Sequence, residues 1–222
     1  MERKARTPEL KALDVTGVIF CGGMSRRMGQ DKALLEVEGQ TLLQKANVLL
    51  EPHVSRVVLS TGPTPRYEKM GLPCVLDPEA DMGPIGGLFA ALTACETPWI
   101  LALACDLPRL SEEAVLELLG ARREGDKAVL FGSPQDPEPL FALYHHGLLP
   151  IVDAAIRSGH RRMTSALGAT DRSSDQAMNH AVRWLPITDD NKGPFSNVNR
   201  PEDWREYQHG CKAATSDGEE HR

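Results

Sequence analysis

The stretch VIFCGGMSRRMGQDK, residues 18–32, sets an apolar run directly before a glycine pair and a cluster of positive charges. The apolar residues predict a buried strand, and the glycines predict a loop that leaves it. A loop that only turns the chain does not need the cations Arg26, Arg27 and Lys32. Glycine lets backbone N–H groups approach an anion closely, so this loop suits a polyphosphate. A plain glycine turn with solvated basic residues is the alternative.

Outward from this stretch, strand-like apolar runs alternate with amphipathic segments. Such alternation predicts an α/β fold of three layers, with a mostly parallel sheet and helices on both of its faces. We expect one domain over residues 15–208, with flexible segments at 1–14 and 209–222. The expected strands are 16–20, 56–60, 73–76, 99–104, 127–131, 141–144 and 182–187, and the expected helices are 41–50, 85–95, one that begins after Ser111, and 148–157.

Composition narrows the class of protein. The 222 residues are 41% hydrophobic and carry a net charge of −6, which argues against a broad basic face for nucleic acid. There is no apolar run of about 18 residues, so we expect no transmembrane helix. The charged start of the chain does not resemble a secretory signal. The five cysteines lack metal-ligand spacing, which favours reduced thiols in a cytoplasmic protein.

Two aspartates follow predicted strands and are therefore expected at the carboxyl edge of the sheet, where ligands bind. Asp106 directly follows the run LALAC. This position suits Mg²⁺, because the ion takes one or two carboxylates together with phosphate oxygens. Asp77 could accept hydrogen bonds from N1–H and N2–H₂ of guanine. Gly83, Gly86 and Gly87 open the helix that follows it. A helix-capping or turn role is the alternative for Asp106. For the segment of Asp77 the alternative is a tight turn that packs the helix on the strand, and we expect this packing role for Gly86 and Gly87 in either case.

The segment FCGGMSRRMGQDKALLEVEGQTLL, residues 20–43, resembles the signature of nucleotidyltransferases. Its Gly-Gly form with an Asp-Lys pair is similar to the molybdenum cofactor guanylyltransferase family, except that Cys21 stands where alanine is usual. The resemblance covers residues 16–205. It implies a Rossmann-like nucleotidyltransferase fold with one antiparallel strand in the sheet.

The resemblance also implies roles for individual residues. Lys32, Asp106 and Arg26 would act in catalysis, and Asp106 would bind Mg²⁺. The residues that it places at the nucleotide are Phe20, Cys21, Gly22, Gly23, Lys32, Ser60, Asp77, Gly83 and Asp106.

Further motifs resemble the family's acceptor-binding segments. These are PEPLFALYHHG from residue 137, GHRRMTSAL from residue 159 and FSNVNRPEDW from residue 195. They imply that Arg161, Arg162, Asn197 and Asn199 hold the acceptor, since a pterin phosphate needs anion contacts and amide hydrogen bonds. Capping of the last helix is the alternative for the asparagines.

The reaction implied by the resemblance is transfer of GMP from GTP to molybdopterin or its molybdate adduct, with release of pyrophosphate. Cytidylyl transfer to the same pterin, or nucleotidyl transfer to a sugar phosphate, is the alternative reaction. A regulator or cofactor chaperone that binds a nucleotide without turnover is the alternative class. Partners on this interpretation are GTP, the pterin, and proteins of molybdopterin synthesis or target molybdoenzymes, with no nucleic acid and no membrane.

Overall fold

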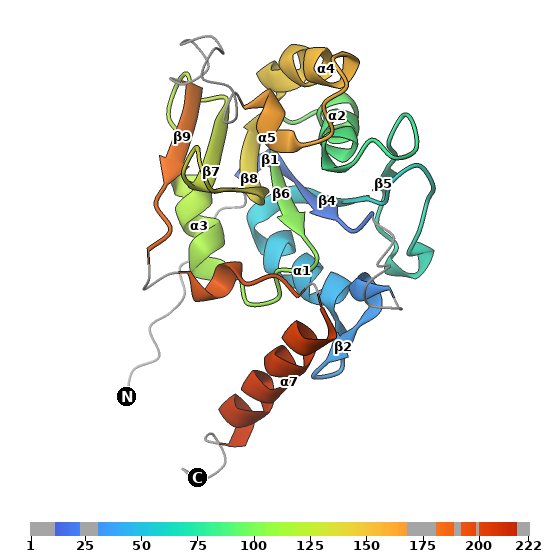
Figure 1. Ribbon diagram of the computed structural model, residues 1–222, viewed down its shortest axis with the longest axis vertical. Coiled ribbons are helices and arrows are strands. Elements are labelled where there is room, and N and C mark those ends of the chain that lie inside the picture. The colour runs from blue at the N-terminus through green and yellow to red at the C-terminus, as the bar shows by residue number, and fades with distance from the viewer. Residues whose placement is uncertain (1–11, 23–30, 168–180, 189–191, 199, 217–222) are drawn as a thin grey trace.

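The computed structural model describes residues 12–22, 31–167, 181–188, 192–198 and 200–216. Its main sheet has the strand order β5-β4-β1-β6-β8-β7-β9 (Figure 1). The bounds are β1 Ala12–Phe20, β4 Val54–Ser60, β5 Cys74–Val75, β6 Trp99–Ala104, β7 Ala128–Gly132, β8 Pro137–His145 and β9 Val182–Leu185. A separate hairpin pairs β2 Glu36–Val37 with β3 Gln40–Thr41.

Strand direction in the main sheet agrees with the expected fold. β1 pairs in parallel with β4 and β6, and β7 pairs in parallel with β9. β8 is antiparallel to both of its neighbours, β6 and β7. The predicted mostly parallel sheet with one antiparallel strand is therefore confirmed.

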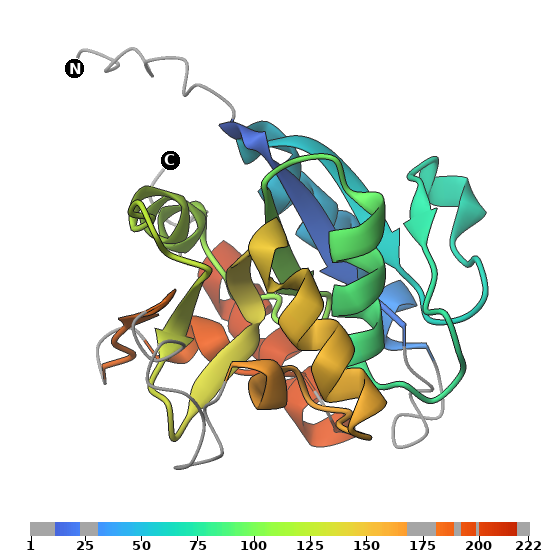
Figure 2. The same ribbon diagram turned by 90° about the horizontal axis from the view of Figure 1, so that it is seen from above.

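Helices cover both faces of this sheet. The α-helices are α1 Leu42–Leu50, α2 Pro84–Ala94, α3 Glu112–Gly120, α4 Leu149–Arg157, α5 Met163–Ala166 and α7 Pro201–Ser216. The 3-10 turns are η1 Lys32–Leu34, η2 Glu51–His53, η3 Glu68–Met70, η4 His146–Leu148 and η5 Gly193–Phe195. Figures 1 and 2 show α1 and α3 on one face of the sheet and α2, α4 and α5 on the other.

Local sequence explains where the helices begin. Thr41 caps α1 in a capping box with Gln44, and Ser111 caps α3 as expected, its side chain accepting from the amide of Ala114. All of Trp99–Ala104 in β6 is buried because helices lie over both faces of the central strands. The core therefore forms two apolar layers, one on each side of the sheet.

The regular structure reaches beyond the domain limits expected from the sequence. β1 begins at Ala12, and α7 continues to Ser216, past the expected end at 208. Figure 1 shows α7 extending away from the sheet beside β2. Tyr207 of α7 packs with Leu35, Val37 and Leu42, which attaches this helix to the domain. Within the described part of the chain, no helix is long and apolar enough to cross a bilayer.

Candidate active site

A cleft of about 680 Å³ opens where β1, β4 and β6 end. It collects side chains from segments that are far apart in the sequence, because parallel strands end at the same edge of a sheet. Eight of the predicted nucleotide residues line it: Phe20, Cys21, Gly22, Lys32, Ser60, Asp77, Gly83 and Asp106. The predicted catalytic residue Arg26 and the predicted nucleotide residue Gly23, together with Arg27, lie outside the described residues.

Lys32 and Asp106 meet inside this cleft. Lys32 opens η1, Asp106 follows β6, and the Lys32 Nζ donates to Asp106 Oδ2 at 3.4 Å. Burial raises the pKa of the Asp106 carboxyl above its ordinary value, and the nearby Lys32 ammonium opposes that rise. Burial therefore outweighs the ammonium, and the ionised carboxylate remains only partly compensated by its cation.

Close packing requires a glycine, Gly22, in the turn after β1. The amides of Cys21 and Gly22 both donate to the carbonyl of Ser60, at 3.0 and 2.9 Å. A Cβ on Gly22 would come within 2.6 Å of the amide nitrogen of Gly62 and 2.7 Å of the carbonyl carbon of Thr61. The sequence interpretation gave the Gly22 amide to an anion, whereas in the structure this amide is bonded to Ser60 and the residue allows the close approach of two loops.

The thiol of Cys21 is part of the same turn. Its Sγ donates to the Ser60 carbonyl at 3.6 Å, and burial raises its pKa to about 12. The thiol is therefore neutral near pH 7 and is a poor nucleophile. No disulfide links the described cysteines Cys21, Cys74, Cys95 and Cys105.

Asp77 lies elsewhere along the lining of the same cleft. Its amide donates to the Gly62 carbonyl at 3.0 Å, which fixes the residue against the end of β4. Its Oδ1 is buried and has no hydrogen-bond partner among the described residues. Burial raises the pKa of this carboxyl. A buried acceptor without a donor is costly, so this oxygen is suited to a ligand that brings N–H groups.

The glycines of α2 bring this helix close to the strands. A Cβ on Gly86 would lie 2.5 Å from the Cβ of Met82 and 3.0 Å from Asp77 Oδ2, and a Cβ on Gly87 would lie 2.4 Å from Ser60 Oγ. The packing role that the sequence suggested for both glycines is what these distances require. Gly83 has a φ of +69° and lines the cleft at the N-terminus of α2.

Two of the predicted acceptor segments reach residues of this cleft. The carbonyl oxygen of Arg161 would lie 2.8 Å from a Cβ on Gly83, so the exposed pair Arg161 and Arg162 follows α4 to the rim. The amide of Val198 donates to the carbonyl of Asp106 at 2.9 Å, and Asn197 precedes it with an exposed side chain. Asn199 lies outside the described residues.

The third segment places Glu138 near the metal candidate. Glu138 is the second residue of β8, whose Leu140 lines the cleft. Burial is the main cause that raises the Glu138 pKa to about 7, the negative charges of Asp106 and Asp136 add to the rise, and the amide of Leu140 opposes it. Negative charge is therefore concentrated at this end of the cleft.

Comparison with known proteins agrees with this geometry. Residues 17–196 match the model of the MobA-like NTP transferase domain. The chain belongs to this family. It is 35% identical over 158 residues to a molybdenum cofactor guanylyltransferase of Bordetella petrii, covering 68% of this chain and 81% of that protein. It is 30% identical over 207 residues to a probable molybdenum cofactor guanylyltransferase of Synechococcus elongatus, covering 88% and 99%.

Solved structures of low identity show the same fold. Molybdopterin-guanine dinucleotide biosynthesis protein A from Archaeoglobus fulgidus matches with a TM-score of 0.69 at 22% identity, over 89% of this chain and 99% of that one. The 2-C-methyl-D-erythritol 4-phosphate cytidylyltransferase of Thermus thermophilus matches with a TM-score of 0.60 at 16% identity, over 88% and 98%. The nucleotidyltransferase architecture expected from the sequence is confirmed.

The structure adds cleft residues that the sequence did not lead us to predict as site residues. Asp31, Thr61, Thr64, Arg66 and Asp81 also line the cleft. Asp31 stands inside the signature, beside Lys32, and that position was the available signal for it. Arg66 comes from the connection between β4 and β5, where no pattern in the sequence pointed to a site.

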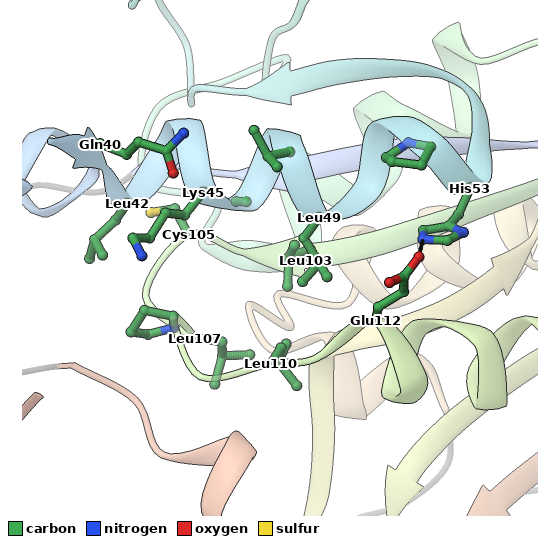
Figure 3. Close-up of a pocket in the computed structure, with 14 residues that line it drawn as sticks. Gln40, Leu42, Lys45, Leu49, His53, Leu103, Cys105, Leu107, Leu110 and Glu112 are labelled. Atoms are coloured by element: carbon green, nitrogen blue, oxygen red, sulfur yellow. Dashed lines mark ion pairs between the residues drawn. The ribbon is translucent and has the colours of Figure 1, made fainter. Parts of the chain in front are cut away.

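A second cavity of about 450 Å³ lies between α1 and the segment that joins β6 to α3 (Figure 3). Its lining is mostly apolar, with the buried His53 Nε2 held 3.2 Å from Glu112 Oε1. It includes none of the predicted nucleotide, metal or acceptor residues. Cys105 borders both cavities, and the candidate active site of this family member is the cleft at the strand ends.

Proposed function

We propose that this protein transfers GMP from GTP to molybdopterin or its molybdate adduct and releases pyrophosphate. The proposal is supported by the curated relatives, which are named for this activity, and by one juxtaposition in the structure. A single cleft holds a lysine–aspartate pair and, elsewhere in its lining, a buried carboxylate oxygen with no donor among the described residues. The pair suits phosphates with a cation, and the carboxylate suits a base that has N–H donors.

The chain's own residues act mainly by positioning and by neutralising charge. The Lys32 ammonium lies where it can leave Asp106 for the phosphates of GTP. Its stabilisation increases as negative charge develops on the departing pyrophosphate. A phosphate dianion of the acceptor is already nucleophilic, so no general base is required, and alignment of the two substrates supplies much of the rate.

Asp106 is proposed as the ligand of Mg²⁺. Its half-buried carboxylate, which lines the cleft beside Lys32, suits a divalent cation. No group of at least three His, Cys, Asp or Glu side chains is assembled among the described residues, so protein groups alone make no cage there. This fits Mg²⁺, which is held by one or two carboxylates together with substrate phosphates, and which when bound supplies Lewis-acid stabilisation of phosphoryl charge.

Asp77 is proposed to read the base. Its unpartnered Oδ1 can accept from N1–H of guanine, and N2–H₂ offers a second donor to the same carboxylate. Adenine and cytosine lack that pair of donors, so a site built around it discriminates strongly. Phe20, Ser60 and Gly83 line the same cleft, in keeping with their predicted nucleotide role.

Arg161, Arg162 and Asn197 are proposed to hold the acceptor. The arginines follow α4 beside Gly83, and Asn197 precedes the residue bonded to Asp106. Guanidinium groups bind phosphate through paired hydrogen bonds, and an amide suits a pterin ring. A cytoplasmic location, and contacts with molybdopterin-synthesis proteins or target molybdoenzymes, remain predictions.

The deciding experiment measures pyrophosphate release from the purified protein with molybdopterin, Mg²⁺ and either GTP or CTP. We expect release with GTP and much less with CTP. Equal or greater release with CTP would indicate cytidylyl transfer, and release only with a sugar phosphate as acceptor would indicate that alternative. If both nucleotides bind without release, the chain is a nucleotide-binding regulator or cofactor chaperone.

A further inference from the structure

Three side chains form a connected group between the start of η1 and the connection from β4 to β5. Arg66 Nη2 makes an ion pair with Asp31 Oδ2. The hydroxyl of Tyr67 lies 2.9 and 3.1 Å from the two carboxylate oxygens of Asp31. The same hydroxyl lies 3.2 Å from the carbonyl oxygen of Cys21. Its single proton is therefore shared among the two Asp31 oxygens and this carbonyl oxygen. We call Asp31, Arg66 and Tyr67 the clasp.

The members of the clasp are themselves held in place. The Arg66 guanidinium lies over the Tyr67 ring, 4.9 Å from its centroid. The carbonyl of Arg66 accepts from Cys74 Sγ at 3.6 Å, which ties this connection to β5. Tyr67 adopts a φ of +64°, a left-handed conformation that a bulky residue rarely takes. Backbone strain of this kind persists where the surrounding contacts determine it.

The clasp acts on Lys32 through its neighbour. Asp31 caps η1, because its Oδ1 accepts from the amide of Ala33 at 3.2 Å, and Lys32 is the first residue of η1. Once the Asp31 carboxylate is fixed by Arg66 and Tyr67, the backbone at Lys32 is fixed as well. Cys21 and Asp31 also flank the glycine- and arginine-containing stretch 22–30, so one hydroxyl contacts both flanking residues.

We propose that Arg66 and Tyr67 are positioning residues that hold Lys32 at the phosphates through Asp31. The assignment rests on the nucleotidyl transfer proposed above and adds residues that the sequence motifs do not contain. The Tyr67 hydroxyl makes no contact with the reacting atoms in this account. It keeps Asp31, and therefore Lys32, in one place before the nucleotide arrives, which lowers the cost of alignment at the moment of reaction.

Tyr67→Phe tests this proposal, because it removes only the hydroxyl and keeps the ring against Arg66. We expect kcat/KM for GTP to fall about tenfold, the usual scale of a lost hydrogen bond to a charged group. In a Lys32→Ala background the same change is expected to have no further effect, since the residue being positioned is gone. Equal losses in both backgrounds, or no loss in the parent, would overturn the proposal.

Ser55→Ala is the matched control. Ser55 Oγ donates to the carbonyl of Val15 at 2.7 Å and so joins β4 to β1 near the strand ends away from the cleft. The substitution therefore also removes one partly buried hydroxyl. We expect its thermal stability to fall about as much as that of Tyr67→Phe while kcat/KM stays within about twofold of the parent. A tenfold loss of kcat/KM in Ser55→Ala as well would mean that the Tyr67→Phe effect comes from lower stability in general, and it would overturn the assignment.

Amide hydrogen exchange of the ligand-free protein separates this proposal from the proposed reaction. In Tyr67→Phe we expect faster exchange at Ala33, whose amide is bonded to Asp31, and at Cys21 and Gly22, with no such change in Ser55→Ala. Unchanged exchange at these amides would overturn the clasp even if the parent releases pyrophosphate. A parent that releases none would overturn the proposed reaction alone, and the exchange result would still decide whether the clasp holds Asp31.

Discussion

Two of the carboxylates that line the cleft, Asp106 and Asp77, have different surroundings. Asp106 lies 3.4 Å from the Lys32 ammonium, and nearby Asp31 is paired with Arg66. Asp77 has a buried Oδ1 that meets no donor among the described residues, and its Oδ2 faces the glycine surface of α2. A cation therefore lies beside the carboxylate at the first site, whereas a carboxylate oxygen at the second site has no described donor.

The comparison separates two kinds of ligand. A site of paired charges can exchange its partners, since a phosphate can take the lysine while a cation takes the aspartate. A lone buried acceptor is satisfied best by neutral N–H donors, which add hydrogen bonds without adding another charge. Burial raises the pKa of both carboxyls, but only for Asp106 does a neighbouring cation oppose the rise.

Lys32→Ala should have the largest effect, because it removes the positive charge from the paired site. We expect kcat/KM for GTP to fall roughly 10³-fold, with the fold intact. Lys45→Ala is the matched control: Lys45 pairs with Glu38 at 2.8 Å and borders the second cavity rather than the cleft. If Lys32→Ala keeps the turnover and nucleotide affinity of the parent, the proposed phosphate-binding role of Lys32 is rejected.

Asp106→Asn should follow, with a loss of roughly 10²-fold in kcat at limiting Mg²⁺. The pKa of this carboxyl is raised by burial, so its contribution to stability is lost as the pH rises from the ordinary pKa through the raised one. The Tm of the ligand-free variant at pH 8 should therefore be at least that of the parent. Full activity at limiting Mg²⁺ would remove Asp106 as the metal ligand.

Asp77→Ala tests the unpaired site. We expect the GTP:CTP ratio of kcat/KM to narrow by about tenfold, because only guanine loses its acceptor. The Tm should stay level or rise, since a carboxylate with one buried, unsatisfied oxygen has been removed. A purely structural turn role predicts the reverse pattern, namely a lower Tm and equal losses with both nucleotides.

Glu138→Gln should give the smallest effect and measures the excess negative charge near Asp106. The Glu138 pKa is about 7 in the folded protein against an ordinary value of 4.5. Its contribution to stability is therefore complete below about pH 4.5 and is lost as the pH rises to about 7. The Tm of Glu138→Gln should exceed that of the parent increasingly across this window and then stay level.

Glu113→Gln is the control of opposite sign. Hydrogen bonds from its own amide and from Ser111 lower the Glu113 pKa. Its contribution is present above the ordinary pKa and is lost as the pH falls through the lowered one. The variant should therefore lose Tm at neutral pH and match the parent in acid. A parallel pH profile in the two variants would contradict the burial of Glu138.

Much of the fold was predictable because the responsible signals are local. The apolar run of 99–104 predicted a strand with the observed bounds, and Ser111 predicted the start of α3. The extent of α7 was missed. Its sequence EDWREYQHGCKAA is mostly polar, and its described apolar contacts come from Tyr207 and Trp204, which pack in the cluster of Leu35, Val37, Leu42 and Val198.

The site divides in the same way. Lys32, Asp77 and Asp106, which line the cleft, could be predicted because the family signature and the ends of predicted strands mark them. Arg66 and Tyr67 were not found, since their importance lies in contacts with Asp31 across 35 and 36 positions of sequence. The hydrogen bond from the Gly22 amide to Ser60 was not predicted either, because Ser60 is contributed by another strand.

The sequence by itself determined the alternation of strands and helices, the chemistry of the residues at the strand ends, and the family. Those properties depend on neighbours in the chain, whose periodicity and residue type can be read directly. The tertiary structure decided which polar groups are satisfied: Asp106 meets Lys32, Asp31 meets Arg66 and Tyr67, and Asp77 Oδ1 meets no described donor. A buried polar group is satisfied only when the fold brings a hydrogen-bonding partner within about 3 Å of it, and the local sequence pattern does not specify that distance.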